Sequence, residues 1–103
     1  IFEHAYYSVI SPEGCAAILW KDRSHAEEAA GALRLGASDL LELGVVDEIL
    51  LEPTGGAHRD PERSAEALKQ ALGANLKKLS RSSLNKLVKD RYAKFRAMGV
   101  VSE

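Results

Sequence analysis

Extended structure in this sequence is confined to two short segments, and their scarcity is the strongest constraint on the fold. Aromatic and β-branched residues over 6–10 predict one strand, and residues 45–51 predict a turn that leads into a second. An isolated pair of short strands is marginal, because a stable sheet usually needs three or more strands with a buried face. We therefore expect both strands to pair with chain outside these 103 residues, and the lack of an initiator methionine favours the same interpretation.

The first predicted strand leads directly into a helix start signal. Ser11 is placed to cap a helix, with Pro12 at its first position and Glu13 in its first turn, and this helix should run to about Trp20. Such a junction directs free N–H groups, and the positive end of the helix dipole, at whatever lies beyond the strand end. Gly14 would let a ligand or another backbone come close. Residues 11–14 are thus a candidate binding site, and an ordinary capped junction is the alternative.

Similar signals predict helices through the rest of the chain. An alanine-rich helix over 25–35 should be capped by Ser24 and stopped by Gly36, and a short helix over 39–43 should be capped by Ser38 and stopped by Gly44. Asp60-Pro61-Glu62 repeats the earlier start signal before a long helix, which a serine cluster over 80–83 separates from a final helix. Both carry apolar stripes at helical spacing: Ala65, Leu68, Leu72, Leu76 and Leu79, then Leu84, Leu87, Val88, Tyr92, Phe95 and Met98.

The composition excludes several classes of protein. Apolar residues make up 46% of the chain, so intrinsic disorder is not expected. A single cysteine, Cys15, cannot form an internal disulfide and, with three scattered histidines, gives no zinc spacing, so we expect no metal. No apolar run approaches the roughly 20 residues of a membrane span, and the first residues lack the charged-then-apolar pattern expected of a secretory signal. We expect a reducing, cytoplasmic setting.

A second candidate site is the loop between the second strand and the long helix. Gly55 and Gly56 could offer N–H groups to an anion, with Arg59 as the positive charge. The lysine and glycine spacing of a phosphate-binding P-loop is missing. The alternative is a flexible connection in which Arg59 pairs with a nearby acid.

Ordered phrases along nearly the whole chain resemble the C-terminal part of the α subunit of bacterial-type acetyl-CoA carboxylase carboxyltransferase. The phrases cover residues 7–16, 18–21, 37–43, 46–49, 52–59 and 91–99, and Ser-Pro-Glu-Gly at 11–14 and Gly-Gly-Ala-His-Arg at 55–59 are the most specific. The resemblance implies an α/β fold: the end of a crotonase-like spiral of ββα units, mostly helical, over 1–59, then a helical extension over 60–103 that packs on a neighbouring subunit.

The resemblance also implies an activity and partners. The carboxyl group of carboxybiotin on a carrier protein would pass to acetyl-CoA and give malonyl-CoA, the first committed step of fatty acid synthesis. The partners would be the rest of the α subunit, a carboxyltransferase β subunit, the biotin carboxyl carrier protein and biotin carboxylase. The glycines of the oxyanion hole would lie upstream, so no catalytic residue is expected here and this piece alone should be inactive. The substrate-binding candidates are Ser11, Pro12, Glu13, Gly14, Gly55, Gly56 and Arg59.

Two other functions remain open at this point. A crotonase-type acyl-CoA hydratase or isomerase would need a carboxylate beside the thioester, and Glu13 is the only acid at a suitable junction. A basic helical module that binds a partner or nucleic acid is suggested by residues 77–96, which hold eight bases and one acid, whereas residues 1–60 hold eleven acids and four bases. Tyr92 and Phe95 lie on the apolar stripe and are expected in a core, so we favour solvated or subunit-facing helices over nucleic-acid binding.

Overall fold

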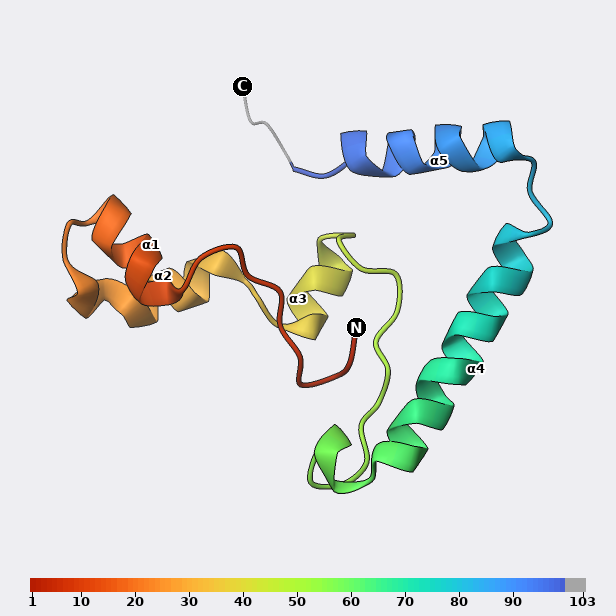
Figure 1. The fold of residues 1–103 in the computed structure, drawn as a ribbon. Coiled ribbons are helices and arrows are strands. Elements are labelled where there is room, and N and C mark those ends of the chain that lie inside the picture. The colour runs from red at the N-terminus through yellow and green to blue at the C-terminus, as the bar shows by residue number, and fades with distance from the viewer. Residues whose placement is uncertain (100–103) are drawn as a thin grey trace.

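Five α-helices and two short 3₁₀ helices follow one another in the computed structural model, which describes residues 1–99. The α-helices are α1 (Pro12–Leu19), α2 (Ala26–Leu33), α3 (Ala37–Glu42), α4 (Pro61–Leu79) and α5 (Leu84–Arg96), and the 3₁₀ helices are η1 (Arg23–His25) and η2 (Ala57–Arg59). The predominantly helical content is as the sequence predicts. Figure 1 shows α1 and α2 side by side at one end, with α4 and α5 at the other.

Helix α1 begins where the start signal predicts. The Ser11 hydroxyl accepts a hydrogen bond from the Gly14 N–H at 3.1 Å, and Pro12 occupies the first position. Helix α1 packs on α2 and η1, and the alanines Ala16 and Ala29 are completely buried. Small side chains on both helices allow close approach, so this pair forms the best-packed part of the described chain.

The limits of the next two helices differ from the prediction. Ser24 caps no helix: Asp22 caps η1, accepting hydrogen bonds from the backbone N–H (2.9 Å) and hydroxyl (2.6 Å) of Ser24. Helix α2 ends before Gly36, because Arg34 takes the left-handed conformation at φ 49°. The Arg34 guanidinium pairs with carboxylates of α3, at 2.9 Å in the case of Asp39, and these contacts hold the turn.

Helix α3 starts earlier than predicted, directly after Gly36, so Ser38 lies inside it and caps nothing. Its predicted stop is confirmed, since Gly44 has φ 70°. Leu40 of α3 is 7% exposed and belongs to the small buried core.

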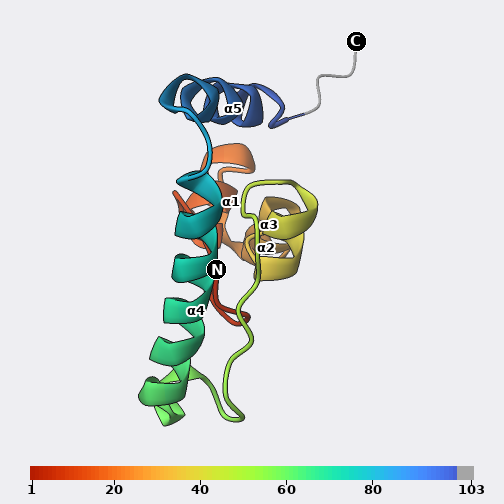
Figure 2. The same cartoon turned by 90° about the vertical axis from the view of Figure 1, so that its right-hand side faces the viewer.

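Helices α4 and α5 follow the sequence signals closely. The carboxylate of Asp60 accepts from the Arg63 N–H at 2.9 Å to cap α4, and Ser83 caps α5. Their apolar stripes, however, are largely uncovered: Leu72 is 61% and Leu76 69% exposed. Helices α4 and α5 are separate rods (Figures 1 and 2), and no other α-helix within residues 1–99 packs along either of them.

Neither predicted strand forms within residues 1–99. Extended pairing there is limited to a parallel bridge between Phe2 and Leu50 and an antiparallel bridge between Tyr6 and Gly36. The Leu50 N–H donates to the Ile1 carbonyl at 2.8 Å, and the Glu3 N–H donates to the Leu50 carbonyl at 2.9 Å. The Tyr7 N–H donates to the Leu35 carbonyl at 3.3 Å beside the Tyr6–Gly36 bridge, but residues 8–10 extend this pairing no further within the described chain. Leu50 therefore does find one partner inside this chain, contrary to the expectation for the second strand.

The described elements form an open, flat arrangement. The principal extents are 49 × 43 × 17 Å, and the radius of gyration is 17.4 Å, against about 13 Å for a compact chain of this length. The accessible surface is 8497 Å², against about 5,700 Å² for a compact monomer of this mass. Large apolar side chains therefore remain exposed on several elements.

Candidate functional site

The loop between Pro53 and α4 has a defined backbone conformation. Gly55 and Gly56 have φ values of 92° and 101°, in the region that favours glycine, and η2 follows directly. A Cβ atom on Gly56 would lie 3.0 Å from the His58 ring. A turn hydrogen bond from the Gly56 N–H to the Pro53 carbonyl, at 2.8 Å, closes the loop. The two glycines are thus required by the shape of the loop.

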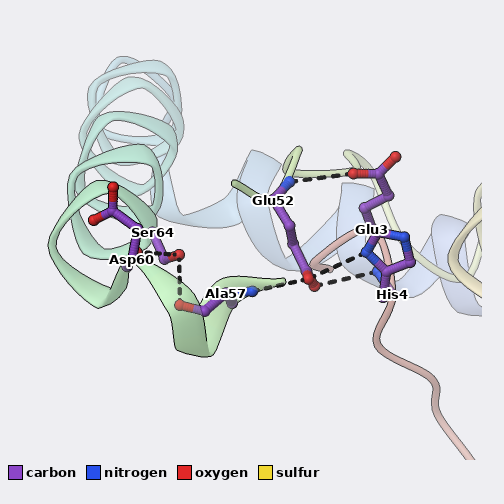
Figure 3. A network of polar contacts seen from close by, with 6 residues as sticks. All are labelled: Glu3, His4, Glu52, Ala57, Asp60 and Ser64. Carbon is purple, nitrogen blue, oxygen red and sulfur yellow. Dashed lines mark hydrogen bonds and ion pairs between the residues drawn. The ribbon is translucent and has the colours of Figure 1, made fainter. Parts of the chain in front are cut away.

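Glu52, immediately before this loop, joins it to the N-terminal segment (Figure 3). Its Oε1 accepts from the His4 N–H at 3.2 Å, and its Oε2 accepts from the Ala57 N–H at 3.1 Å. The His4 ring lies beside the same carboxylate, with Nδ1 3.2 Å from Oε2. The Glu3 carboxylate in turn accepts from the Glu52 N–H at 3.2 Å. One side chain therefore bridges two segments separated by about half the chain.

The ionisation of Glu52 reflects this environment. Only 8% of its side chain is exposed, and desolvation by itself would raise the pKa of the carboxyl group. The backbone hydrogen bonds from His4 and Ala57, with the His4 ring, outweigh that effect and lower the pKa below its ordinary value. Glu52 is therefore an ionised acceptor at neutral pH.

Ser64 holds the other end of the loop to α4. It is 6% exposed, and its hydroxyl is 2.9 Å from the Asp60 carbonyl and 3.2 Å from the Ala57 carbonyl (Figure 3). Ala57 is thus fixed on both sides, through its N–H by Glu52 and through its carbonyl by Ser64.

An open hollow of about 750 Å³ lies beside the loop, lined by Phe2, His4, Glu52, Gly55, Gly56 and His58, among others. Arg59 is exposed and makes no ion pair within residues 1–99, so the predicted pairing with a nearby acid is absent from the described chain. Glu52, before the loop, is bound to N–H groups instead, and Asp60, directly after Arg59, caps α4 through the Arg63 N–H. Gly55 and Gly56 line the hollow, and the exposed side chain of Arg59 lies against Gly55.

The other candidate segment, residues 11–14, lies on α1 and away from this loop in both views (Figures 1 and 2). Ser11 acts as a cap, and Glu13 is exposed in the first turn. A Cβ on Gly14 would lie 3.0 Å from Ile10 Cγ1, so the absence of a side chain there lets Ile10 pack against the helix start. The structure therefore keeps the two predicted site segments apart.

The basic helices are partly neutralised by ion pairs. Lys94 contacts both carboxylate oxygens of Asp47 at 2.8 Å, and Lys86 pairs with Asp90. The predicted core role of Tyr92 and Phe95 is not found, since they are 68% and 54% exposed. The reason is that no described element packs on that face of α5. Arg91 lies 4.9 Å from the Phe95 ring centroid, which leaves that ring face occupied by a cation.

Two further features of the described residues bear on function. None of the helices within residues 1–99 has both the length and the apolar character needed to cross a bilayer. In the same residues, no group of three or more His, Cys, Asp or Glu side chains could hold a metal ion.

Sequence reasoning missed Glu52, His4 and Ser64 as parts of the loop. The signal available for Glu52 was its place directly before a proline and a glycine pair, where a short turn brings an acid close to later N–H groups. No local signal could have identified His4, because it lies 48 residues away from Glu52.

Comparison with known proteins gives the family. Residues 1–99 match the family described as "Acetyl co-enzyme A carboxylase carboxyltransferase-like". The chain is 52% identical over 103 residues to a protein of Rhodopirellula baltica named acetyl-coenzyme A carboxylase carboxyl transferase subunit alpha, and covers 32% of it. Proteins of the same name are 53% identical over the whole chain in Thermus thermophilus (33% of that protein) and 56% identical over 96% of the chain in Sorangium cellulosum (31% of that protein).

The chain therefore belongs to the acetyl-coenzyme A carboxylase carboxyltransferase-like family. It spans about a third of the length of the curated relatives that it matches. The resemblance recognised in the ordered phrases of the sequence is confirmed.

Proposed function

We propose that this chain is the C-terminal part of a carboxyltransferase α subunit that takes part in the transfer of a carboxyl group from carboxybiotin, carried on a biotin carboxyl carrier protein, to acetyl-CoA. The product would be malonyl-CoA, and the step would commit the acetyl group to fatty acid synthesis. The observation that carries the proposal is identity of 52–56% to named α subunits across nearly the whole chain. No specific observation favours the hydratase, isomerase or nucleic-acid alternatives.

The open shape supports a role as part of a larger assembly. An accessible surface about 2,800 Å² above that of a compact monomer of this mass is comparable to a large subunit interface. We assign this surface to the rest of the α subunit and to a β subunit, with biotin carboxylase as a further partner. In that assembly residues 1–59 would complete a crotonase-like ββα spiral and residues 60–103 would form a subunit-packing extension, four of whose residues lie outside those described. We expect the complex in the cytoplasm, or in the plastid stroma of a plant.

The loop at 55–59 is the better of the two candidate substrate sites. Carboxybiotin, as a substrate delivered by the carrier protein, supplies the carboxyl group, and the thioester of coenzyme A supplies the acceptor carbon. Both substrates carry anionic groups, and an exposed guanidinium beside two glycines fits such a group. The role proposed for Gly55, Gly56 and Arg59 is to bind and orient that group, while the oxyanion donors for the enolate come from elsewhere in the complex.

Residues 11–14 have a supporting role in this proposal. The N–H groups of the first turn of α1 point away from the helix body, but the Gly14 N–H is already bonded to Ser11. Pro12 has no N–H to offer. We therefore assign Ser11, Pro12, Glu13 and Gly14 to the start and placement of α1 in the assembled subunit rather than to direct contact with substrate.

The test is reconstitution of the complete carboxyltransferase. The full-length α subunit, combined with its β subunit and supplied with carboxylated carrier protein, should form malonyl-CoA from acetyl-CoA, whereas residues 1–103 alone should form none. A complete complex that binds acetyl-CoA but never carboxylates it, with a β subunit known to be competent, would refute the proposal.

A further inference from the structure

The contacts around Glu52 differ from those of the other acids in the described chain. Most acidic side chains in residues 1–99 are exposed, whereas the Glu52 side chain is 8% exposed and uses its two oxygens to join His4, 48 residues away, to Ala57 in the adjacent loop. Its Oε1 atom accepts a hydrogen bond from the His4 N–H, and its Oε2 atom accepts one from the Ala57 N–H. The Ala57 N–H lies directly after the two left-handed glycines, so its position determines how the loop turns.

We infer that Glu52 is a positioning residue for the substrate loop: it clamps the N–H of Ala57 to the N-terminal segment and so fixes Gly55, Gly56 and Arg59 in the arrangement that receives the anionic group of a substrate. The inference rests on the function proposed above for this loop. Glu52 itself does not touch substrate, because its oxygens are occupied by protein N–H groups.

The two hydrogen bonds accepted by Glu52 can be tested with a substitution that keeps the size of the side chain. In Glu52→Gln the side chain keeps its size but has one accepting oxygen and one NH₂ group. In one amide orientation the NH₂ faces the N–H of Ala57, and in the other it faces the N–H of His4, so each orientation leaves one backbone donor opposed by another donor. Loss of a hydrogen bond to a charged acceptor commonly changes an equilibrium by about tenfold or more.

Glu3→Gln is the matched control. The Glu3 carboxylate accepts one hydrogen bond, from the Glu52 N–H at 3.2 Å, and the carbonyl oxygen of glutamine can accept it equally well. Both substitutions remove one negative charge from the same small region. An effect of charge alone would therefore appear in both variants, and an effect of the clamp only in Glu52→Gln.

The experiment uses the full-length subunit assembled with its β subunit. Hydrogen exchange is followed by mass spectrometry in the peptide that covers 53–60, and KM and kcat are measured for acetyl-CoA and for the carboxylated carrier. We expect amide exchange of the loop peptide to be about tenfold faster or more in Glu52→Gln. Arg59→Ala identifies which of the two substrates the loop binds, and KM for that same substrate should also rise in Glu52→Gln. The Glu3→Gln variant should match the wild type in both measurements. Glu52→Asp, which keeps both oxygens, should lie between the wild type and Glu52→Gln.

The outcomes separate the two proposals. Unchanged exchange in Glu52→Gln, or unchanged KM when Arg59→Ala raises KM, would overturn the role of Glu52 alone. If Arg59→Ala has no effect on either substrate, the substrate role of the loop itself is wrong. If Glu52→Gln fails to assemble, the test rests on Glu52→Asp. Exchange and KM values in Glu52→Asp that equal those of the wild type would overturn the inference.

Discussion

Residues 1–103 produced on their own should unfold without the cooperativity of a normal domain, because the described elements bury too little surface. The accessible surface of 8497 Å² means that folding hides about 48% of what the unfolded chain exposes, compared with about 65% for a compact protein of this mass. Even a marginal 60-residue domain hides about 60%. The deficit lies in particular elements, such as the exposed stripe of α4.

The deficit in buried surface should appear as a lower m-value in denaturant unfolding. The m-value scales with the surface exposed on unfolding, so the isolated chain should have an m-value about a quarter below that of a compact domain of equal length. The transition should also differ between probes. The sole tryptophan, Trp20, stacks on His25 beside the α1–α2 pair, whereas most of the far-ultraviolet helical signal comes from the long helices α4 and α5.

The assay is urea unfolding of the isolated monomer, with Trp20 fluorescence and circular dichroism recorded on the same samples. We expect broad transitions whose midpoints do not coincide, since α4 and α5 do not pack on the α1–α2 pair. The full-length subunit in its complex serves as the reference. Coincident, steep transitions of the isolated monomer, with the m-value of a compact domain, would refute the reasoning about its open surface.

The remaining predictions concern single residues in the full-length subunit. Ser11→Ala should destabilise α1 by about 1 kcal/mol, seen as faster amide exchange in that helix, whereas Ser38→Ala should have little effect because Ser38 caps nothing. Gly73→Ala, in the open interior of α4, should stabilise that helix by about 1 kcal/mol, and Gly56→Ala should lower the melting temperature through its φ of 101° and its contact with the His58 ring. The folded pKa of Glu52 lies below its ordinary value of 4.5, so its contribution to stability is complete above that pH and is lost as the pH falls through the folded-state value. Loop protection factors measured against pH should show this loss in the wild type and not in Glu52→Gln.

The helix limits show how far local signals can predict this chain. The starts of α1 and α4 follow from a cap, a proline and an acid within three consecutive residues, and the structure confirms both. The end of α2 could not be predicted in this way, because Arg34 is held in a left-handed conformation by carboxylates of the next helix. Such a contact has no trace in the propensity of arginine itself.

The extended segments and the loop site show a second limit of prediction from sequence, which is that contacts between distant residues leave no local signal. Residues 6–10 have the composition of a strand, but a strand is defined by hydrogen bonds to a neighbour, and the described chain provides one bridge at Tyr6. The glycine loop was predicted as a site from its residues, whereas the acid that fixes it was not. Its contacts join residue 52 to residues 4 and 57, and the first of these depends on the path of the whole chain between them.

The charge distribution and the exposed apolar stripe together indicate how α5 is held against the rest of the protein. The basic segment over 77–96 meets the acidic body through the ion pair of Lys94 with Asp47, the side chain of which is 79% exposed. A single exposed pair contributes about 0–1 kcal/mol, too little to hold a helix of thirteen residues in place. The apolar stripe of α5 must therefore supply the larger part of its docking energy by burial against another surface. Within the described residues, α5 is therefore oriented by its ion pair with Asp47, but its apolar stripe is not yet buried. Burial of that stripe against another surface is what would fix α5 in place.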